Sequence, residues 1–214
     1  MSSEISPEQF RAADGVEDWR LLFDGANVFY RTQSMLAGAS LAGTIGALDG
    51  MADLEAAVDL RADGVTVRLS WYSGFTEQHI SLAQQISVAA HAVGGQADAS
   101  RVQVVQIAVD ALSMPAAVAF WRVVLGYRQR GDEDLFDDRG RGPQLWFQQM
   151  DEPRPQRNRI HVDISLPRVE AHARVHAAIA AGGILISDSH APLWWSLADP
   201  EGNEVDIAAH TDID

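Results

Sequence analysis

Three polar side chains alternate along the segment NRIHVDISLP, residues 158–167, and they are the residues best suited to chemistry. His161, Asp163 and Ser165 share one face of the predicted strand, because successive strand side chains point to opposite faces. An imidazole can take up and release protons near neutral pH. His161 and Asp163 are therefore our candidate catalytic residues. The alternative is that Asp163 only binds a buried backbone group or an arginine.

An internal repeat relates His161 to three further residues. Gln106 and His161 fall at matching points on the first strand of each copy, 55 residues apart. Gln148 and Asp206 fall near matching points on the last strand of each copy. If the strand register slips by one residue, Gln149 replaces Gln148. We expect the chemistry of this half of the chain at these four positions.

The repeat also predicts the elements that must position these residues. In each copy a strand precedes a helix, the helix ends at glycine, and three shorter strands follow; a glycine is a common C-cap signal. Each copy thus has the order β-α-β-β-β. The second half is predicted to contain paired βαβββ modules.

The first half of the chain predicts a different arrangement, α-β-β-α-β-β-α. Ser6 starts the first helix with a capping box. Apolar and polar residues alternate over 58–60 and again over 65–69, and Asp63-Gly64 supplies a positive-φ turn between these strands. This pattern predicts a four-stranded antiparallel sheet with three helices, so the whole chain is an α+β protein.

A small, polar segment separates the two halves. Gly94 to Ser100 contains glycine and few apolar residues, as a domain linker does. We therefore predict a first domain over residues 1–95, a linker over 96–100 and a second domain over 101–214.

Composition limits the partners and the location of the protein. The 30 acidic against 16 basic residues give a net charge of −14, which repels phosphates, so nucleic acid and anionic membranes are not expected partners. A basic run at 154–159 either closes over an anionic ligand group or only joins two strands. The chain has no cysteine, no export signal and no apolar run that could span a bilayer, so a cytoplasmic protein is expected.

Four motifs of the second half resemble the vicinal oxygen chelate superfamily, in particular its glyoxalase-like members. They are AVAFWRVVLGY, GPQLWFQQM, NRIHVDI and WWSLADPEGNEVDI. In the last motif, Gly202 is expected to take a φ that other residues resist. The resemblance covers residues 101–210. It implies two modules whose sheets curl around one cavity that binds a small molecule.

The resemblance also implies a ligand set. In metal-dependent members, four side chains in that cavity hold a divalent ion, and the corresponding residues here are Gln106, Gln148, His161 and Asp206. An imidazole and a carboxylate suit a metal, but two neutral amides are weak ligands, and the ion would meet one negative charge. We therefore favour no cofactor, with a divalent metal as the alternative.

Aromatic residues are expected to line the same cavity. One of Trp194 and Trp195 should face inward and the other outward, so one of them can wall the pocket. We select Trp195, with core packing as the competing explanation. Trp146, Gln106 and Gln148 complete the predicted substrate-binding set.

Residues 6–94 resemble the pterin-4a-carbinolamine dehydratase family. The resemblance rests on DWRLLFDGANVFYRT, VDLRADGVTVRLS and GFTEQHISLAQQI. It implies a small antiparallel sheet with helices on one face, and dehydration of a 4a-hydroxytetrahydropterin, which is a lyase reaction. It also implies assembly through helix or strand edges, with a homodimer as the candidate.

The catalytic motif of that family is not present in this sequence. Its His-His-Pro falls on Leu54, Glu55 and Ala56, a further histidine falls on Tyr72, and an aspartate falls on His79. Glu55, Tyr72 and His79 either form a replacement acid–base set or are a solvated charge, a rim aromatic and a surface residue. We favour the second interpretation and regard this as a degenerate dehydratase site.

Three functions follow from these observations. The first is a small-molecule-binding protein or lyase-type enzyme with its site in the second domain. The second is an active pterin dehydratase with a substituted site in the first domain. The third is a non-catalytic ligand sensor in which the first domain mediates dimerisation.

Overall fold

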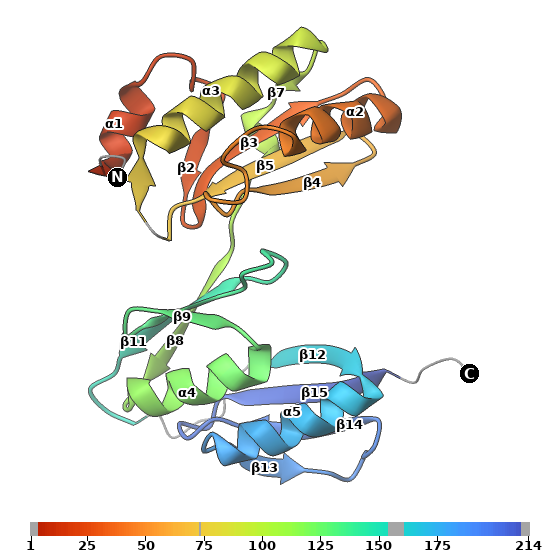
Figure 1. Ribbon diagram of the computed structural model, residues 1–214. Helices are drawn as coiled ribbons and strands as arrows, with labels where there is room; N and C mark the ends of the chain where they lie inside the picture. Colours follow the sequence, from red (N-terminus) through yellow and green to blue (C-terminus); the bar gives the residue numbers. More distant parts are fainter. Residues whose placement is uncertain (1–3, 73, 154–160, 211–214) are drawn as a thin grey trace. The chain divides into compact units, whose positions relative to one another are not determined.

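The computed structural model describes residues 4–72, 74–153 and 161–210 of the chain (Figure 1). The basic run at 154–159 lies outside the described residues. The chain forms two compact units, Met1–Val104 and Val105–Asp214.

The first unit is built on a five-stranded antiparallel sheet, one strand more than expected because β7 (Gln96–Ala97) joins it, and two helices cover one face of the sheet (Figure 1). Its elements, in chain order, are β1 (Glu4–Ile5), α1 (Pro7–Ala12), β2 (Arg20–Leu22), β3 (Gly25–Arg31), α2 (Met35–Gly46), β4 (Ala57–Arg61), β5 (Gly64–Ser70), β6 (Phe75–Thr76), α3 (Glu77–Ala92), β7 (Gln96–Ala97) and the 3₁₀ turn η1 (Ala99–Arg101).

The strand order of this sheet is β2-β3-β5-β4, and β2 and β4 are its edges. The short strands β1 and β6 pair with each other, and β7 pairs with β3. Apolar side chains of α2, α3 and the central strands form the core, including Leu41, Ile45, Val67 and Ile86.

The linker expected at 96–100 is instead part of the first unit. β7 pairs with the end of β3, and the Asp98 amide donates to the Phe29 carbonyl at 3.0 Å. The Asp98 carboxylate also binds Arg31 at 2.7 Å. A polar segment with this many backbone and ion-pair partners is folded onto the sheet, so the division of the chain falls later, between Val104 and Val105.

The capping box and the β-hairpin predicted for this unit both form, but the turn glycine differs from the expectation. The Ser6 capping box forms, because the Ser6 amide donates to Gln9 Oε1 at 2.7 Å and the Gln9 amide donates to Ser6 Oγ at 3.2 Å. The β4–β5 hairpin also forms. Gly64, however, is not among the described glycines with positive φ. Glycine is required there by close packing, since a Cβ would lie 2.3 Å from the Tyr30 carbonyl oxygen.

The second unit contains the two βαβββ modules predicted from the repeat. Its elements are β8 (Gln106–Ala111), α4 (Met114–Leu125), β9 (Arg128–Arg130), β10 (Asp134–Phe136), β11 (Gln144–Gln149), β12 (Val162–Pro167), α5 (Arg168–Ala180), β13 (Ile184–Ser187), β14 (Trp194–Ala198) and β15 (Glu204–His210).

Both modules have the same topology. The strand orders are β8-β11-β10-β9 and β12-β15-β14-β13, so the first and last strands of each module are parallel neighbours. Helices α4 and α5 lie together (Figure 1) and bury one shared core that includes Phe120, Trp121, Val175 and Leu197.

The D-P-E-G-N turn fastens the two modules to each other. Its Asp199 is fully buried and accepts from Trp121 Nε1 of α4 at 2.9 Å. Glu201 accepts from the Ser113 amide at the start of α4, at 2.7 Å. Gly202 has φ +88°, which confirms the conformation expected from the sequence.

No helix in the described part of the chain is long and apolar enough to cross a bilayer.

Candidate functional site

The polar face predicted for residues 161–165 is present on the second module. Val162 and Ile164 pack against the core, whereas Asp163 and Ser165 are exposed on the opposite face of β12. His161 directly precedes the strand and is also exposed. Strand alternation therefore places these polar groups together and away from α5.

His161 and Asp163 form a cluster with Asp206 of β15. His161 Nε2 lies 3.3 Å from Asp163 Oδ1. Asp163 is paired with Asp206 in the parallel register of β12 and β15, so their side chains lie side by side on one face. One ligand atom from each of the three residues falls within 4.8 Å of the others.

This donor set fits a divalent cation. Like charges at paired strand positions repel each other, so Asp163 and Asp206 favour a positive charge between them. An imidazole nitrogen with two carboxylates suits ions such as Zn²⁺, Mn²⁺ or Fe²⁺. Asp163, which we assigned as catalytic from the sequence, thus joins His161 and Asp206 as a candidate ligand. The parallel register that pairs Asp163 with Asp206 could not be read from one strand alone.

The remaining predicted residues of this half lie on the sheet of the first module. β8 and β11 are parallel neighbours, with Gln148 opposite Asp110. Gln106, Trp146 and Gln148 occupy alternate positions on one face of this sheet. The Gln149 side chain instead donates to the Leu112 and Met150 carbonyls at 3.0 and 2.9 Å. Gln148 rather than Gln149 therefore shares the face of Trp146.

Trp195 does not occupy the position expected of a pocket wall. It is 7% exposed, belongs to the core beneath α5 and meets the His172 ring edge-to-face at 4.7 Å. Trp194 points to the other face of β14, the face of Asp206, and stacks on His190 with ring centroids 4.0 Å apart. The two tryptophans are equally apolar, so alternation alone could not decide which one faces the core.

His79 of the first unit is a buried structural residue and not the surface residue expected from the sequence. It is 4% exposed. Nδ1 accepts from the Thr76 amide at 3.1 Å, so Nε2 carries the proton and donates to the Ser70 carbonyl at 3.0 Å. Burial lowers the pKa of His79, although its hydrogen bonds to the Ser70 and Thr76 backbone act in the opposite direction. Thr76 and His79 together form a capping box at the start of α3.

Of the other residues of the degenerate site, Leu54, Glu55 and Ala56 directly precede β4, and Tyr72 follows β5. Leu54 and Ala56 are partly buried against the core of the first unit. Glu55 is exposed and has φ +46°, the only positive φ among the described non-glycine residues. Tyr72 is half-buried after β5. A cavity of about 310 Å³ borders Leu54, and its described lining contains carboxylates and amides but no imidazole.

The second unit thus combines paired βαβββ modules with a cluster of one histidine and two carboxylates. Residues 106–208 match the family model of the glyoxalase-like domain, in agreement with the resemblance of the motifs in this half. A sequence comparison with curated proteins finds no match. The comparisons give no support to the dehydratase resemblance of the first half.

Several solved structures are similar to about half of the chain. A glyoxalase-related enzyme from Fulvimarina pelagi is 20% identical, with 50% of this chain and 88% of that chain covered and a TM-score of 0.40. A glyoxalase/bleomycin resistance protein/dioxygenase family enzyme from Burkholderia phytofirmans is 17% identical, with 50% and 98% covered and a TM-score of 0.39. The fosfomycin resistance protein FosX from Mesorhizobium loti is 8% identical, with 51% and 92% covered and a TM-score of 0.41.

Proposed function

We propose that the second unit binds a divalent cation through His161, Asp163 and Asp206 and binds a small oxygen-containing molecule beside it. The observation that carries this proposal is the cluster of one imidazole and two carboxylates within 4.8 Å. From the sequence we favoured a site without a cofactor because only one negative charge was assigned to it. Asp163 supplies the second negative charge and reverses that preference.

A lyase-type reaction on a molecule with two neighbouring oxygen atoms fits this arrangement. A bound cation supplies a positive charge that stabilises negative charge as it develops on those oxygens. Asp163 and Asp206 would balance the charge of the cation, and His161 would be its third ligand. The stacked rings of Trp194 and His190 lie on the same face of the sheet, where Trp194 pairs with Ala208 two residues beyond Asp206. They would border one side of the bound molecule.

A metal-free site is the alternative for the same residues. The His161–Asp163 contact at 3.3 Å would then serve proton transfer, with Asp163 orienting the imidazole. The metal-bound and metal-free hypotheses predict different effects when a carboxylate is removed. A metal site loses its ion, whereas a metal-free site keeps its ligand and loses only the reaction.

Calorimetric titration with Mn²⁺ and Zn²⁺ after chelator treatment tests the proposal. We expect binding of one ion per chain, lost in His161→Ala and Asp206→Asn and unchanged in His176→Ala, an exposed histidine of the same unit. If the unmodified chain takes up neither ion, or if His161→Ala binds as tightly as His176→Ala, the cation site is wrong.

We further propose that the first unit does not dehydrate pterins. Both ring nitrogens of His79 are bound to backbone groups, so this imidazole is not available to move protons to or from a substrate. Leu54 and Ala56, in place of the family's histidine and proline, carry no titratable group. We expect no turnover of a 4a-hydroxytetrahydropterin. Measurable turnover that disappears in Glu55→Ala would overturn this assignment.

A further inference from the structure

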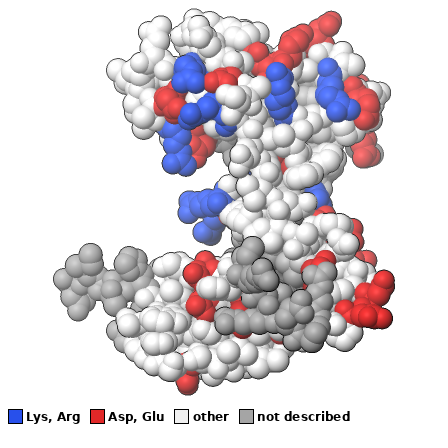
Figure 2. Space-filling view, turned by 180° about the vertical axis from the view of Figure 1, so that it is seen from behind, with Lys and Arg blue, Asp and Glu red and all other residues white. Residues whose placement is uncertain are grey.

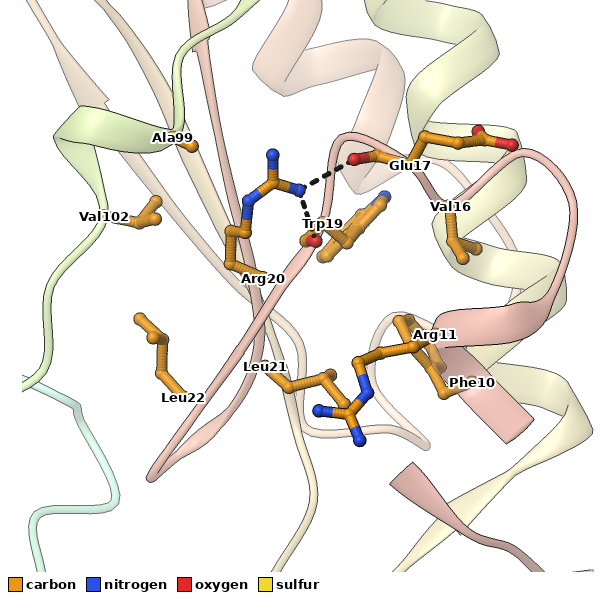
Figure 3. A pocket seen from close by; sticks show the side chains of 10 residues that line it. All are labelled: Phe10, Arg11, Val16, Glu17, Trp19, Arg20, Leu21, Leu22, Ala99 and Val102. Carbon is orange, nitrogen blue, oxygen red and sulfur yellow. Dashed lines mark hydrogen bonds between the residues drawn. The ribbon is translucent and has the colours of Figure 1, made fainter. Parts of the chain in front are cut away.

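The first unit contains a cavity that neither the degenerate site nor the second unit explains. Its volume is about 570 Å³, within the range of small-molecule sites. It lies between α1, the edge strand β2 and the segment around η1 (Figure 3). Its lining mixes polar and apolar groups, and among its apolar side chains Leu21, Leu22 and Val102 are half-buried whereas Phe10, Val16 and Trp19 are buried.

Two guanidinium groups border this cavity, and they differ in their partners. Arg11 pairs with Glu8 at 3.0 Å. Arg20 donates from one nitrogen to the Glu17 and Trp19 backbone carbonyls at 2.7 and 2.8 Å, as the dashed lines in Figure 3 mark. These two bonds to main-chain oxygens fix the Arg20 guanidinium against the cavity and leave its charge unneutralised.

Arg20 is exceptional among the basic residues of its unit. The other five arginines of the first unit each have a carboxylate within 3.6 Å: Arg11, Arg31, Arg61, Arg68 and Arg101. Figure 2 shows this mixing, with acidic side chains lying among the basic ones over the first unit. Within the described ranges, Arg20 has no carboxylate partner, although acidic residues outnumber basic ones 30 to 16 in the chain.

The acidic residue that lines the cavity does not neutralise Arg20. Glu17 lines the cavity, but its carboxylate points away from Arg20 in Figure 3 and accepts from the Gly15 amide at 2.9 Å. The hydrogen bond from the Gly15 amide is the main cause that lowers the pKa of Glu17. The Glu17 backbone carbonyl, and not its side chain, is the group that contacts Arg20.

From these contacts we propose that the cavity binds a small molecule with an apolar ring body and one anionic group. The ring body lies against Leu21, Leu22 and Val102, which are half-buried and gain by being covered. The anionic group meets the free donors of Arg20, whose planar fork suits a carboxylate or sulfonate. This site is independent of the cation site proposed for the second unit.

A fluorescent anion, 8-anilinonaphthalene-1-sulfonate, tests the proposal on the full chain. We expect saturable binding that Arg20→Gln weakens about fivefold, the order of one exposed charged contact. Arg61→Gln, which removes an exposed arginine outside the cavity, should leave the affinity unchanged. The uncharged analogue N-phenyl-1-naphthylamine should bind the unmodified chain and Arg20→Gln equally.

A second variant and two competitors complete the experiment. Val102→Glu places a carboxylate on the cavity wall with Arg20 intact, and it should abolish sulfonate binding while circular dichroism stays unchanged. 1-Naphthoate should displace the probe, and inorganic phosphate should not. The proposal is overturned if the probe does not bind, if Arg20→Gln and Arg61→Gln bind it alike, or if phosphate alone displaces it as well as 1-naphthoate does.

Discussion

Two histidines of this chain have opposite surroundings. His79 is 4% exposed, and both of its ring nitrogens bind the backbone. The His161 side chain is 48% exposed, and its close partners are carboxylates. A buried imidazole with two backbone partners stabilises the fold, whereas an exposed imidazole beside two carboxylates can take a ligand. The partners of each residue, more than its type, separate structure from function here.

The burial of His79 predicts an effect of pH on the first unit. Its pKa in the folded state is below the ordinary value of about 6.5, so between the two values the unfolded chain binds the extra proton. The contribution of neutral His79 to the free energy of unfolding is therefore fully present above pH 6.5 and is lost as the pH falls below that value. Urea unfolding followed on the amide resonances of α3 between pH 5 and 8 measures this.

The variant His79→Gln distinguishes the contribution of His79 to this pH dependence from the contributions of other titratable groups. His79→Gln should reduce stability at pH 8 by about 1–2 kcal/mol, since one buried backbone partner is lost, and should flatten the dependence below pH 6.5. His176→Gln, in the second unit, should change neither. Equal pH dependence in His79→Gln and the unmodified chain would contradict this explanation.

At the scale of elements, the D-P-E-G-N turn positions the second module against the first. Asp199 is fully buried, accepts from Trp121 Nε1 and Asn203 Nδ2, and also accepts from two amides of its own turn. The motif therefore has a structural role that holds α4 and the final strand β15 in place. Because β15 carries Asp206, the turn also helps to position the cluster of His161, Asp163 and Asp206.

Removal of this carboxylate should destabilise the second unit. Asp199→Ala leaves buried donors on Trp121 and on the turn without an acceptor, and we expect a loss of about 3 kcal/mol. Asp188→Ala, which removes an exposed carboxylate of the same unit, should cost less than about 0.5 kcal/mol. Thermal unfolding followed by near-ultraviolet circular dichroism measures the difference. A similar loss in both variants would show that the turn does not fasten the modules.

Two glycines of the first unit offer a matched test of its packing. Gly64→Ala puts a Cβ 2.3 Å from the Tyr30 carbonyl oxygen and 2.5 Å from the Phe29 ring, so we expect a loss of about 2 kcal/mol or more. Gly43→Ala in α2 meets nothing within 4 Å and should stabilise the helix by about 0.5–1 kcal/mol. Chemical denaturation should show that the two substitutions change the free energy of unfolding in opposite directions.

Local signals predicted the elements better than they predicted the site. The Ser6 capping box, the two βαβββ modules and the strand face of Asp163 follow from neighbouring residues, and all are present. The pairing of Asp163 with Asp206 joins strands far apart in sequence, so no local pattern contains it. His79 was missed for another reason: Thr76 and His79 have capping-box spacing, but a histidine replaces the usual glutamate or glutamine.

At the scale of the whole molecule, the chain combines two units with separate chemical features. The first has a cavity bordered by Arg20, which has no carboxylate partner among the described residues, and the second has a pair of adjacent carboxylates beside an imidazole. Overall charge favours the second site, because a chain of net charge −14 attracts cations at low ionic strength. Anion binding by the first unit must instead come from local contacts to Arg20.

Paramagnetic broadening by Mn²⁺ is the measurement that most directly tests the cation site. At a small fraction of an equivalent of Mn²⁺, amide resonances of β12 and β15 around Asp163 and Asp206 should broaden first, and Asp206→Asn should remove the effect. Broadening that begins elsewhere, for example along α5 or in the first unit, or that persists in Asp206→Asn, would contradict the proposed site.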